Sequence, residues 1–188
     1  MPVVKQSWVK KPEALEKYLD KDRAAEPVRS VSSGLSEEMA KTIRQEHEKY
    51  RKNVKNLALT IIQSWPEKES NLFPPEKYNE MGQELAKRIA PGHTAFVVTH
   101  TEKNHIHNHI VISSVNSETG KLLNNKRSEF LKMREANNEI ARENGLALNE
   151  KRDKADRSFT PYKAQDMTVR GKKSWFFDMK QKADFTRT

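Results

Sequence analysis

Four of the chain's six histidines lie within ten positions, between His100 and His109, and three of them alternate with other residues. The alternating series His105, His107 and His109 runs into the apolar residues 110–112, which is typical of a β-strand. Successive side chains of a strand point to opposite faces, so these three imidazoles are expected to share one face. A face lined with histidines makes a poor core, and the pattern therefore predicts a β-sheet that carries a functional site.

The spacing of these histidines favours a metal site. Neighbouring imidazoles on the shared face start roughly 6.6 Å apart, so two of them can lean onto one ion at bonds of about 2.0–2.1 Å. His105 and His109 start about 13 Å apart, so they cannot easily both bind the same ion and one of them is not a ligand. His100, at the end of the preceding apolar run, is the expected third ligand.

The pairing of the two strands decides which histidines converge. A hairpin that places His100 opposite His107 predicts the set His100, His107 and His109. A hairpin that places His100 opposite His105 predicts the set His100, His105 and His107, and periodicity does not decide between the two. Either set leaves coordination positions open, as catalytic metal sites do. Glu102 would accept a hydrogen bond from the second ring N–H of a metal-binding histidine and so fix the tautomer of that histidine. The alternative interpretation is that Glu102 is a solvated acidic residue in a loop.

Composition narrows the class of partner. The chain has 188 residues, enough for one domain with a sizeable core, and carries a formal charge of +9 with a pI near 9.6. This excess of lysine and arginine points to a polyanion, most commonly nucleic acid. The chain has no cysteine, which excludes disulfides and thiolate ligands. Without a signal peptide or an apolar run of 18–20 residues, a cytoplasmic protein with no membrane partner is expected.

Patterning along the chain predicts an α+β fold, an antiparallel β-sheet with helices packed on it. Strands are expected at 2–9, 56–65, 94–100 and 106–115, with a further short one at 121–124. Helices are expected at 12–20, 74–90 and 128–144, and from an N-cap at Ser36 to about residue 52. Residues 22–35 and the Pro/Glu/Ser segment after Trp65 are expected to be loops. Residues 1–150 are expected to form one domain, followed by a basic extension, 151–188, whose aromatic residues 175–177 indicate docking on that domain.

The segment HTEKNHIHNHIVISSVNSETG, residues 100–120, resembles the three-histidine motif of plasmid mobilisation relaxases in the HUH endonuclease superfamily. The resemblance is to the MobA/VirD2-like (MOBP) branch. IIQSW (61–65), EMGQELA (80–86) and REANNEIARENGL (134–146) are similar to segments flanking that motif. The resemblance covers about residues 1–150 and implies the relaxase fold, with its histidines on a central strand.

The resemblance also implies roles for the motif residues. The metal triad would be His100, His107 and His109, and His105 would contact a metal-binding side chain or the DNA. Glu102 stands where the family more often has aspartate, and its role would be to support catalysis. The cofactor would be a divalent metal ion, Mn²⁺ or Mg²⁺, with Zn²⁺ as a further candidate.

Relaxases of this kind cut one DNA strand with a tyrosine near the N-terminus, and Tyr18 lies where the family's first motif places it. The alternative interpretation is that Tyr18 packs with Leu15 and Leu19 on an amphipathic helix. Tyr50 is the next candidate, at the end of a basic helix. An ordinary phenol loses its proton only near pH 10, so such a nucleophile needs an electropositive site or a base.

The implied function is a nickase that forms a 5′-phosphotyrosyl bond at an origin of transfer during conjugative mobilisation. Its partners would be single-stranded or hairpin DNA, accessory mobilisation proteins and a coupling protein. Phosphate contacts are expected from the basic residues Arg23, Arg29, Lys121, Lys126 and Arg127. The rival functions are a rolling-circle replication initiator, a three-histidine nuclease that uses water, and a non-catalytic DNA-binding module with a structural zinc.

Overall fold

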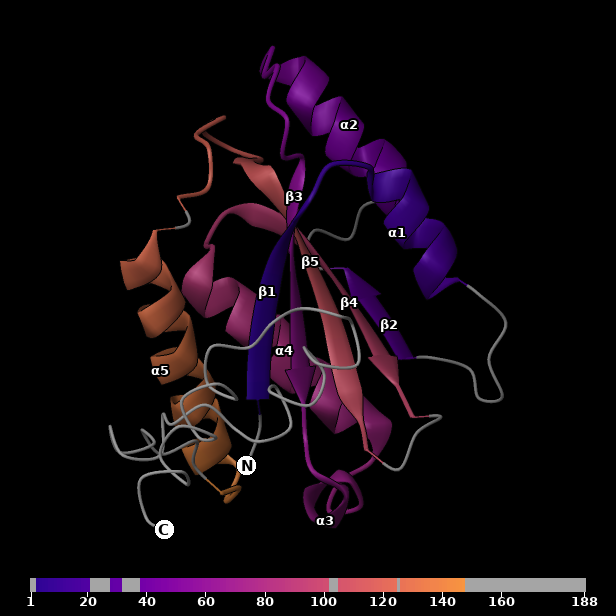
Figure 1. Ribbon diagram of the computed structural model, residues 1–188, viewed down its shortest axis with the longest axis vertical. Coiled ribbons are helices and arrows are strands. Elements are labelled where there is room, and N and C mark those ends of the chain that lie inside the picture. Colours follow the sequence, from indigo (N-terminus) through magenta and orange to yellow (C-terminus); the bar gives the residue numbers. More distant parts are fainter. Residues whose placement is uncertain (1–2, 21–27, 32–37, 102–104, 125, 148–188) are drawn as a thin grey trace, which may run out of the picture. The chain divides into compact units, whose positions relative to one another are not determined.

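The computed structural model describes residues 3–20, 28–31, 38–101, 105–124 and 126–147, which all fall in the first of two units, Met1–Asn149. Its strands are β1 Val3–Val9, β2 Val28–Val31, β3 Ala58–Ser64, β4 His93–His100 and β5 His107–Asn116. Its helices are α1 Pro12–Leu19, α2 Met39–Lys49, α3 Glu67–Ser70, α4 Pro75–Ile89 and α5 Arg127–Glu143 (Figure 1).

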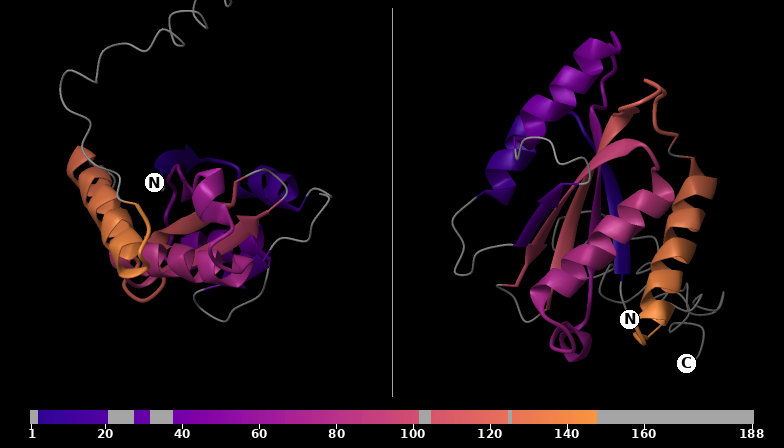
Figure 2. Two further views of the ribbon diagram at one scale, coloured as in Figure 1. Left: turned by 90° about the horizontal axis from the view of Figure 1, so that it is seen from below. Right: turned by 180° about the vertical axis from the view of Figure 1, so that it is seen from behind.

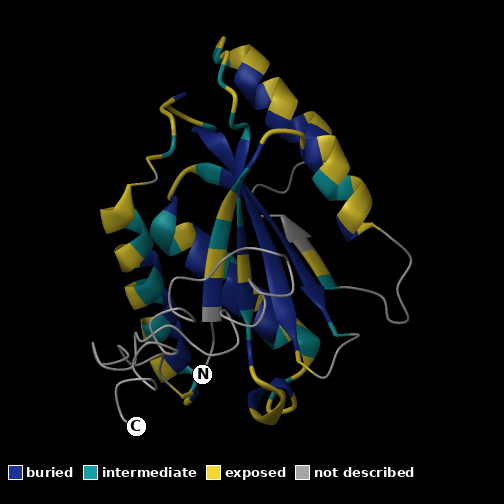
Figure 3. Cartoon of the chain, in the orientation of Figure 1, coloured by how far each residue is buried: buried dark blue, intermediate teal, exposed yellow. Residues whose placement is uncertain are grey.

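The five strands form one antiparallel sheet in the order β1-β3-β5-β4-β2. β5 is therefore the central strand, and β3 and β4 pair with it along its two edges. Every described residue of β5 except its last is buried, and Figure 3 shows the same buried colour along β4. The predicted α+β class, with histidines on a central strand, is confirmed.

One face of the sheet is covered by α4 and α5 (Figure 2). The apolar side of α4 presents Met81 and Leu85, and α5 adds Met133, which pack on Ile110 and Ile112 of β5. Pro75 starts α4 in the first helical turn, where the missing N–H of proline costs nothing. This face is the larger of the two apolar cores.

The other face of the sheet carries α1 and α2, with the smaller apolar core beneath them (Figures 1 and 2). Leu19 of α1 and Ile43 of α2 pack with Val98 of β4 and Val111 of β5. Because side chains alternate along a strand, the residues of β5 on this face are the odd-numbered ones, Val111 among them. The histidines at positions 107 and 109 therefore share a face with α1.

Two elements differ from the sequence-based expectation. Residues 22–35 were expected to be a loop, yet Val28–Val31 form the edge strand β2, paired antiparallel with β4. The Pro/Glu/Ser segment was also expected to be a loop, and it contains the short helix α3. Both elements are only four residues long, too short to show a periodic pattern.

Other expected elements differ only at their ends. The α2 helix starts at Met39 with Glu38 at its N-cap, and Ser36 lies outside the described residues. The expected strand at 121–124 is a single bridge between Val115 and Leu122. The division at residue 150 and the docking of the tail stay predictions, since residues 148–188 are outside the described part. No helix in the described ranges has both the length and the apolar character needed to cross a bilayer.

Candidate active site

Three histidines meet where β4 ends and β5 begins. The strand register places His100, the last residue of β4, directly opposite His107, the first residue of β5. His109 follows two residues later and pairs with Val98 of β4. All three side chains are on the α1 side of the sheet, and all are at most 6% exposed. Of the two pairings that periodicity left open, the structure has the one that joins His100 and His107.

The three imidazoles could hold one metal ion. Their ring centroids are 4.9 to 5.2 Å apart, and one nitrogen from each lies within 4.8 Å of the others. Tetrahedral coordination with bonds of about 2.1 Å requires nitrogens roughly 3.4 Å apart, so small side-chain rotations close the set. A neutral imidazole suits first-row divalent ions, and three of them leave positions open for other ligands.

His105 is not part of this cluster. Its ring centroid lies 5.6 Å from that of His107, the two planes are tilted by 39°, and the residue is exposed at the entrance to β5. Glu102, the expected supporting carboxylate, lies outside the described residues. Its role and that of His105 stay predictions.

Tyr18 lies beside the histidine cluster. Its ring contacts that of His109 edge to face, with centroids 6.0 Å apart and planes at 79°. Tyr18 is 50% exposed, whereas Leu19, its neighbour on α1, is 2% exposed. Leu19 thus packs α1 against the core, whereas the side chain of Tyr18 is partly exposed to solvent. The arrangement is a phenol next to a candidate metal centre, on a surface that a substrate can reach.

Acidic residues on α1 fix the helix that carries Tyr18. Glu13 pairs with Arg44 of α2, and this ion pair holds the pKa of the Glu13 carboxyl below its usual value. A carboxylate oxygen of Glu16 accepts a hydrogen bond from the backbone N–H of Ala40 at 3.1 Å, at the start of α2. Such contacts add to the packing of Leu19 in holding α1 against its neighbours.

The hydroxyls of the other described tyrosines, Tyr50 and Tyr78, form hydrogen bonds to backbone carbonyls away from the histidine cluster. The hydroxyl of Tyr50 donates to the carbonyl oxygens of Ser117 at 2.7 Å and Glu118 at 3.0 Å. Both acceptors follow β5, at the end of that strand remote from the histidines. Tyr78 is fully buried, donates to the Glu69 carbonyl, and has a raised pKa because of its burial.

The basic residues expected to contact DNA fall in different places. Arg29 lies on β2 in register with Val98, on the histidine side of the sheet, and pairs with Asp20 at the end of α1. Arg23 lies outside the described residues. Three exposed residues, Lys121, Lys126 and Arg127, follow the remote end of β5. Of these candidates within the described part, only Arg29 is on the strand row that contains His109.

Sequence reasoning missed two residues on that same row. Ile62 of β3 pairs with His109, and Lys5 of β1 pairs with Ile62, so both extend the row across the sheet. Lys5 is exposed and Ile62 is 36% exposed, which leaves this part of the face open to a ligand. Alternation within β1 and β3 could have shown which face each residue takes, but only the register shows that they lie beside His109.

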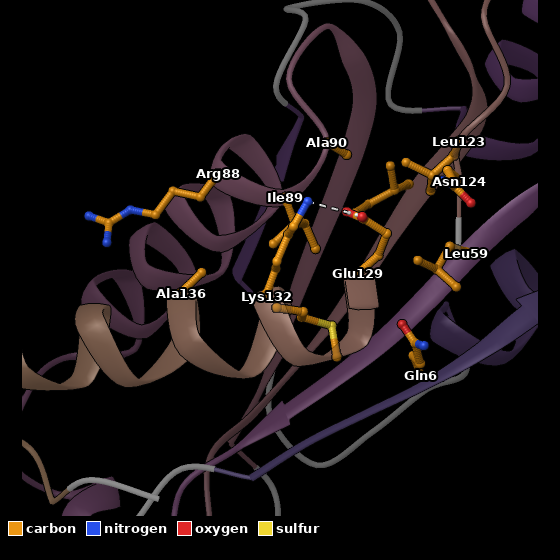
Figure 4. Close-up of a pocket in the computed structure, with 12 residues that line it drawn as sticks. Gln6, Leu59, Arg88, Ile89, Ala90, Leu123, Asn124, Glu129, Lys132 and Ala136 are labelled. Atoms are coloured by element: carbon orange, nitrogen blue, oxygen red, sulfur yellow. Dashed lines mark hydrogen bonds and ion pairs between the residues drawn. The ribbon is translucent and has the colours of Figure 1, made fainter. Parts of the chain in front are cut away.

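Two hollows in the described surface lie away from the histidines. Figure 4 shows one between α5, the end of α4 and the sheet, where Lys132 and Glu129 bond at 3.1 Å above Leu59. This hollow is on the α4–α5 face. A second hollow, at the start of β3, is lined by Glu48 and by five basic side chains, Lys10, Arg44, Arg51, Lys52 and Lys55. Ala58, the first residue of β3, is at the opposite end of that strand from Ser64, which pairs with His107.

Comparison with known proteins points to one family. Residues 14–146 match the family model described as relaxase, MobA/VirD2-like, nuclease domain. "Protein rlx" of Staphylococcus aureus is 36% identical over 137 residues, which are 73% of this chain and 40% of that protein. The group II intron-interrupted relaxase LtrB of Lactococcus lactis is 36% identical over 75 residues, or 39% of this chain and 13% of that protein. The chain thus spans only part of the length of these curated relatives.

Solved structures share the fold at low sequence identity. A MobM relaxase domain (MOBV) bound to plasmid pMV158 oriT DNA, in a Mn-bound crystal, matches with a TM-score of 0.61 and 12% identity. The match covers 89% of this chain and 98% of that one. A structure described as the molecular basis of vancomycin resistance transfer in Staphylococcus aureus gives a TM-score of 0.54 at 12% identity, covering 79% and 96%.

Proposed function

The chain belongs to the family of MobA/VirD2-like relaxase nuclease domains, and we propose that it nicks one strand of plasmid DNA at an origin of transfer for conjugative mobilisation. The observation that carries this proposal is the contact of Tyr18 with His109, since it places a phenol beside three clustered imidazoles. A nucleophile and a candidate metal centre side by side are the two parts that metal-assisted transesterification needs.

His100, His107 and His109 would hold a divalent ion in this proposal. The mutual distances, the burial and the donor type of the three imidazoles all fit such an ion. Mn²⁺ is the first choice because the MobM structure of the same fold is Mn-bound, with Mg²⁺ and Zn²⁺ as the other candidates. A bound ion would neutralise charge on the scissile phosphate and polarise the phosphorus toward attack.

Tyr18 would supply the attacking oxygen. Its Oη forms a bond to phosphorus, the bond from phosphorus to the 3′ oxygen breaks, and the phenolic proton ends on the released 3′-hydroxyl after exchange with solvent. The product is a 5′-phosphotyrosyl bond. Because one phosphodiester is exchanged for another, the reverse reaction can rejoin the strand. The edge-to-face contact with His109 supports this role, since it orients the ring toward the histidine cluster.

DNA would approach over the open part of the histidine face. Lys5 and Arg29 lie at the two ends of the His109 row, where they can bind phosphates on either side of the scissile bond. Ile62 between them offers an apolar surface for a base. The substrate proposed is single-stranded or hairpin DNA, and accessory mobilisation proteins and a coupling protein are the further partners proposed.

A nicking assay tests this proposal. The protein is incubated with Mn²⁺ and single-stranded oligonucleotides that tile the origin of transfer of its own plasmid, and the products are run on denaturing gels. The expected result is a 3′-hydroxyl product and an SDS-resistant protein–DNA species. Tyr18→Phe is expected to remove both. If Tyr18→Phe still cuts the strand without forming an adduct, the nucleophile is water, and the proposal is wrong in favour of a three-histidine nuclease. If the adduct persists in Tyr18→Phe, another tyrosine is the nucleophile.

A further inference from the structure

A row of buried polar side chains crosses the sheet directly behind the histidine cluster. Gln63 of β3 and Thr99 of β4 are the register partners of Asn108 in β5, one on each side. None of the three is more than 1% exposed. They lie on the α4–α5 face, whose core is otherwise apolar. A fully buried polar row inside an apolar face requires an explanation.

The three side chains of this polar row bond directly to one another. The hydroxyl of Thr99 donates to Asn108 Oδ1 at 2.7 Å, and Asn108 Nδ2 donates to Gln63 Oε1 at 3.0 Å. The second hydrogen of Asn108 Nδ2 goes to the carbonyl oxygen of Tyr78 in α4, at 2.6 Å. Both amide hydrogens and the amide oxygen of Asn108 are thus used, and each bond joins a different segment of the fold.

The helices behind the sheet extend the polar row. Asn79 of α4 donates from Nδ2 to the Thr99 hydroxyl at 3.0 Å, and Gln63 Nε2 donates to Asn137 Oδ1 of α5 at 2.9 Å. α4 approaches the row closely because it has Gly82 at the contact. A Cβ on Gly82 would lie 2.5 Å from Asn108 Nδ2 and 2.8 Å from Val97 Cγ1. The polar row therefore has a fixed distance from α4 as well as a fixed register within the sheet.

The polar row alternates with the rows that carry the histidines. The Thr99–Asn108 pair lies between the His100–His107 pair and the row that joins His109 to β4. Each of the three histidines is thus bonded through the chain to a residue of the polar row. A displacement of Asn108 or Thr99 within the sheet must move the backbone of its histidine neighbours on the other face.

Apolar contacts alone fix the register of β4 and β5 poorly. These strands are buried on both faces, and a shift by two residues that pairs Val97 with Ile112 and Val98 with Val111 would still set apolar residues against one another. The same shift would separate Thr99 from Asn108 and Asn108 from Gln63, leaving their donors and acceptors buried without partners. Hydrogen-bonded polar groups in a low-dielectric interior therefore select one register.

We propose that the Gln63–Asn108–Thr99 row is a positioning device for the candidate metal centre, acting through the sheet from the face opposite the imidazoles. The proposal rests on the proposed function, since it assumes that the three histidines bind a metal ion. These residues do not contact the ion or the DNA. They set the backbone positions from which His100, His107 and His109 converge.

Mn²⁺ affinity, measured by calorimetric titration of the otherwise intact chain, tests the proposal. Thr99→Val keeps the side-chain volume but removes the hydroxyl that bonds Asn108 and Asn79, and Thr99→Ser keeps the hydroxyl. Gly82→Ala perturbs Asn108 from the helix without altering any hydrogen-bonding group. Ile112→Val, on the same face of β5 and outside the row, controls for loss of core packing. Thermal unfolding of each metal-free variant shows which of them fold.

Thr99→Val and Gly82→Ala are each expected to weaken Mn²⁺ binding about tenfold, the lower end of what residues behind metal ligands contribute. Thr99→Ser and Ile112→Val are expected to stay within about twofold of the parent chain. The inference is overturned if the first two variants fold and bind Mn²⁺ like the parent, or if Ile112→Val loses as much affinity as they do. If Thr99→Val does not fold, Gly82→Ala decides by the same criteria. If the parent chain itself does not bind Mn²⁺, the proposed function fails, and this positioning role fails with it.

Discussion

The ring of Tyr18 contacts the ring of His109 edge to face, with centroids 6.0 Å apart. The two residues come from distant parts of the chain and meet because α1 packs over the face of β5 that carries the odd-numbered residues. This contact ties the proposed nucleophile to the proposed metal centre. The nucleophile and the metal centre can be tested separately, because a substitution that removes the phenol need not abolish metal binding.

Removing one imidazole of the cluster is expected to weaken Mn²⁺ binding strongly. His100→Ala, His107→Ala and His109→Ala should each lower the affinity by at least about 100-fold, since three ligands become two. His105→Ala is the matched control, because its ring is outside the cluster and the residue is exposed. Calorimetric titration of the four variants should leave His105→Ala within about threefold of the parent chain. An equal loss for His105→Ala would contradict the assignment of the triad.

Tyr50→Phe is expected to reduce stability without reducing nicking. The variant loses the hydrogen bonds from the Tyr50 hydroxyl to the carbonyls of Ser117 and Glu118, at a cost of about 1 kcal/mol in the free energy of unfolding. Urea denaturation measures that loss, and the denaturing-gel assay measures the adduct. A variant that is stable yet forms no adduct would make Tyr50 the nucleophile.

His93 should make the fold sensitive to mild acid. Burial lowers the pKa of His93, although its Nδ1 donates to the Ser113 carbonyl at 2.9 Å. Below about pH 6.5 the unfolded chain takes up a proton at this position, while the folded chain does so only at a lower pH. Stability therefore falls as the pH drops through that interval. His93→Gln should lose less stability than the parent chain between pH 7 and pH 5.5, as measured by urea denaturation at each pH, and parallel curves would contradict this.

Most of the sheet could be predicted from the sequence because its central strands are long and apolar. β3, β4 and β5 each have at least seven residues, and the breaks between them contain proline, glycine or polar runs. β2 could not be predicted, since its four residues include Arg29 and Ser30 and it pairs with only one neighbour. An edge strand takes its structure from the strand beside it, and that pairing is not encoded locally.

The candidate site could be predicted in its residue types but not in its geometry. The alternation of the histidines indicates a shared face, yet the choice between His105 and His109 depends on the register of β4 and β5. That register involves the bonds of Asn108, which reach residues of three other elements. Tyr18 was expected either to attack DNA or to pack with Leu19, and its 50% exposure follows from how α1 is rotated on the sheet.

Identifying the residue linked to DNA decides whether Tyr18 is the nucleophile. The SDS-resistant species formed with origin DNA and Mn²⁺ is digested with trypsin and nuclease, and the nucleotide-bearing peptide is sequenced by mass spectrometry. We expect a nucleotide on the peptide that runs from Tyr18 to Lys21. A nucleotide on the peptide Tyr50-Arg51, or a strand cut with no modified tyrosine anywhere in the chain, would contradict it.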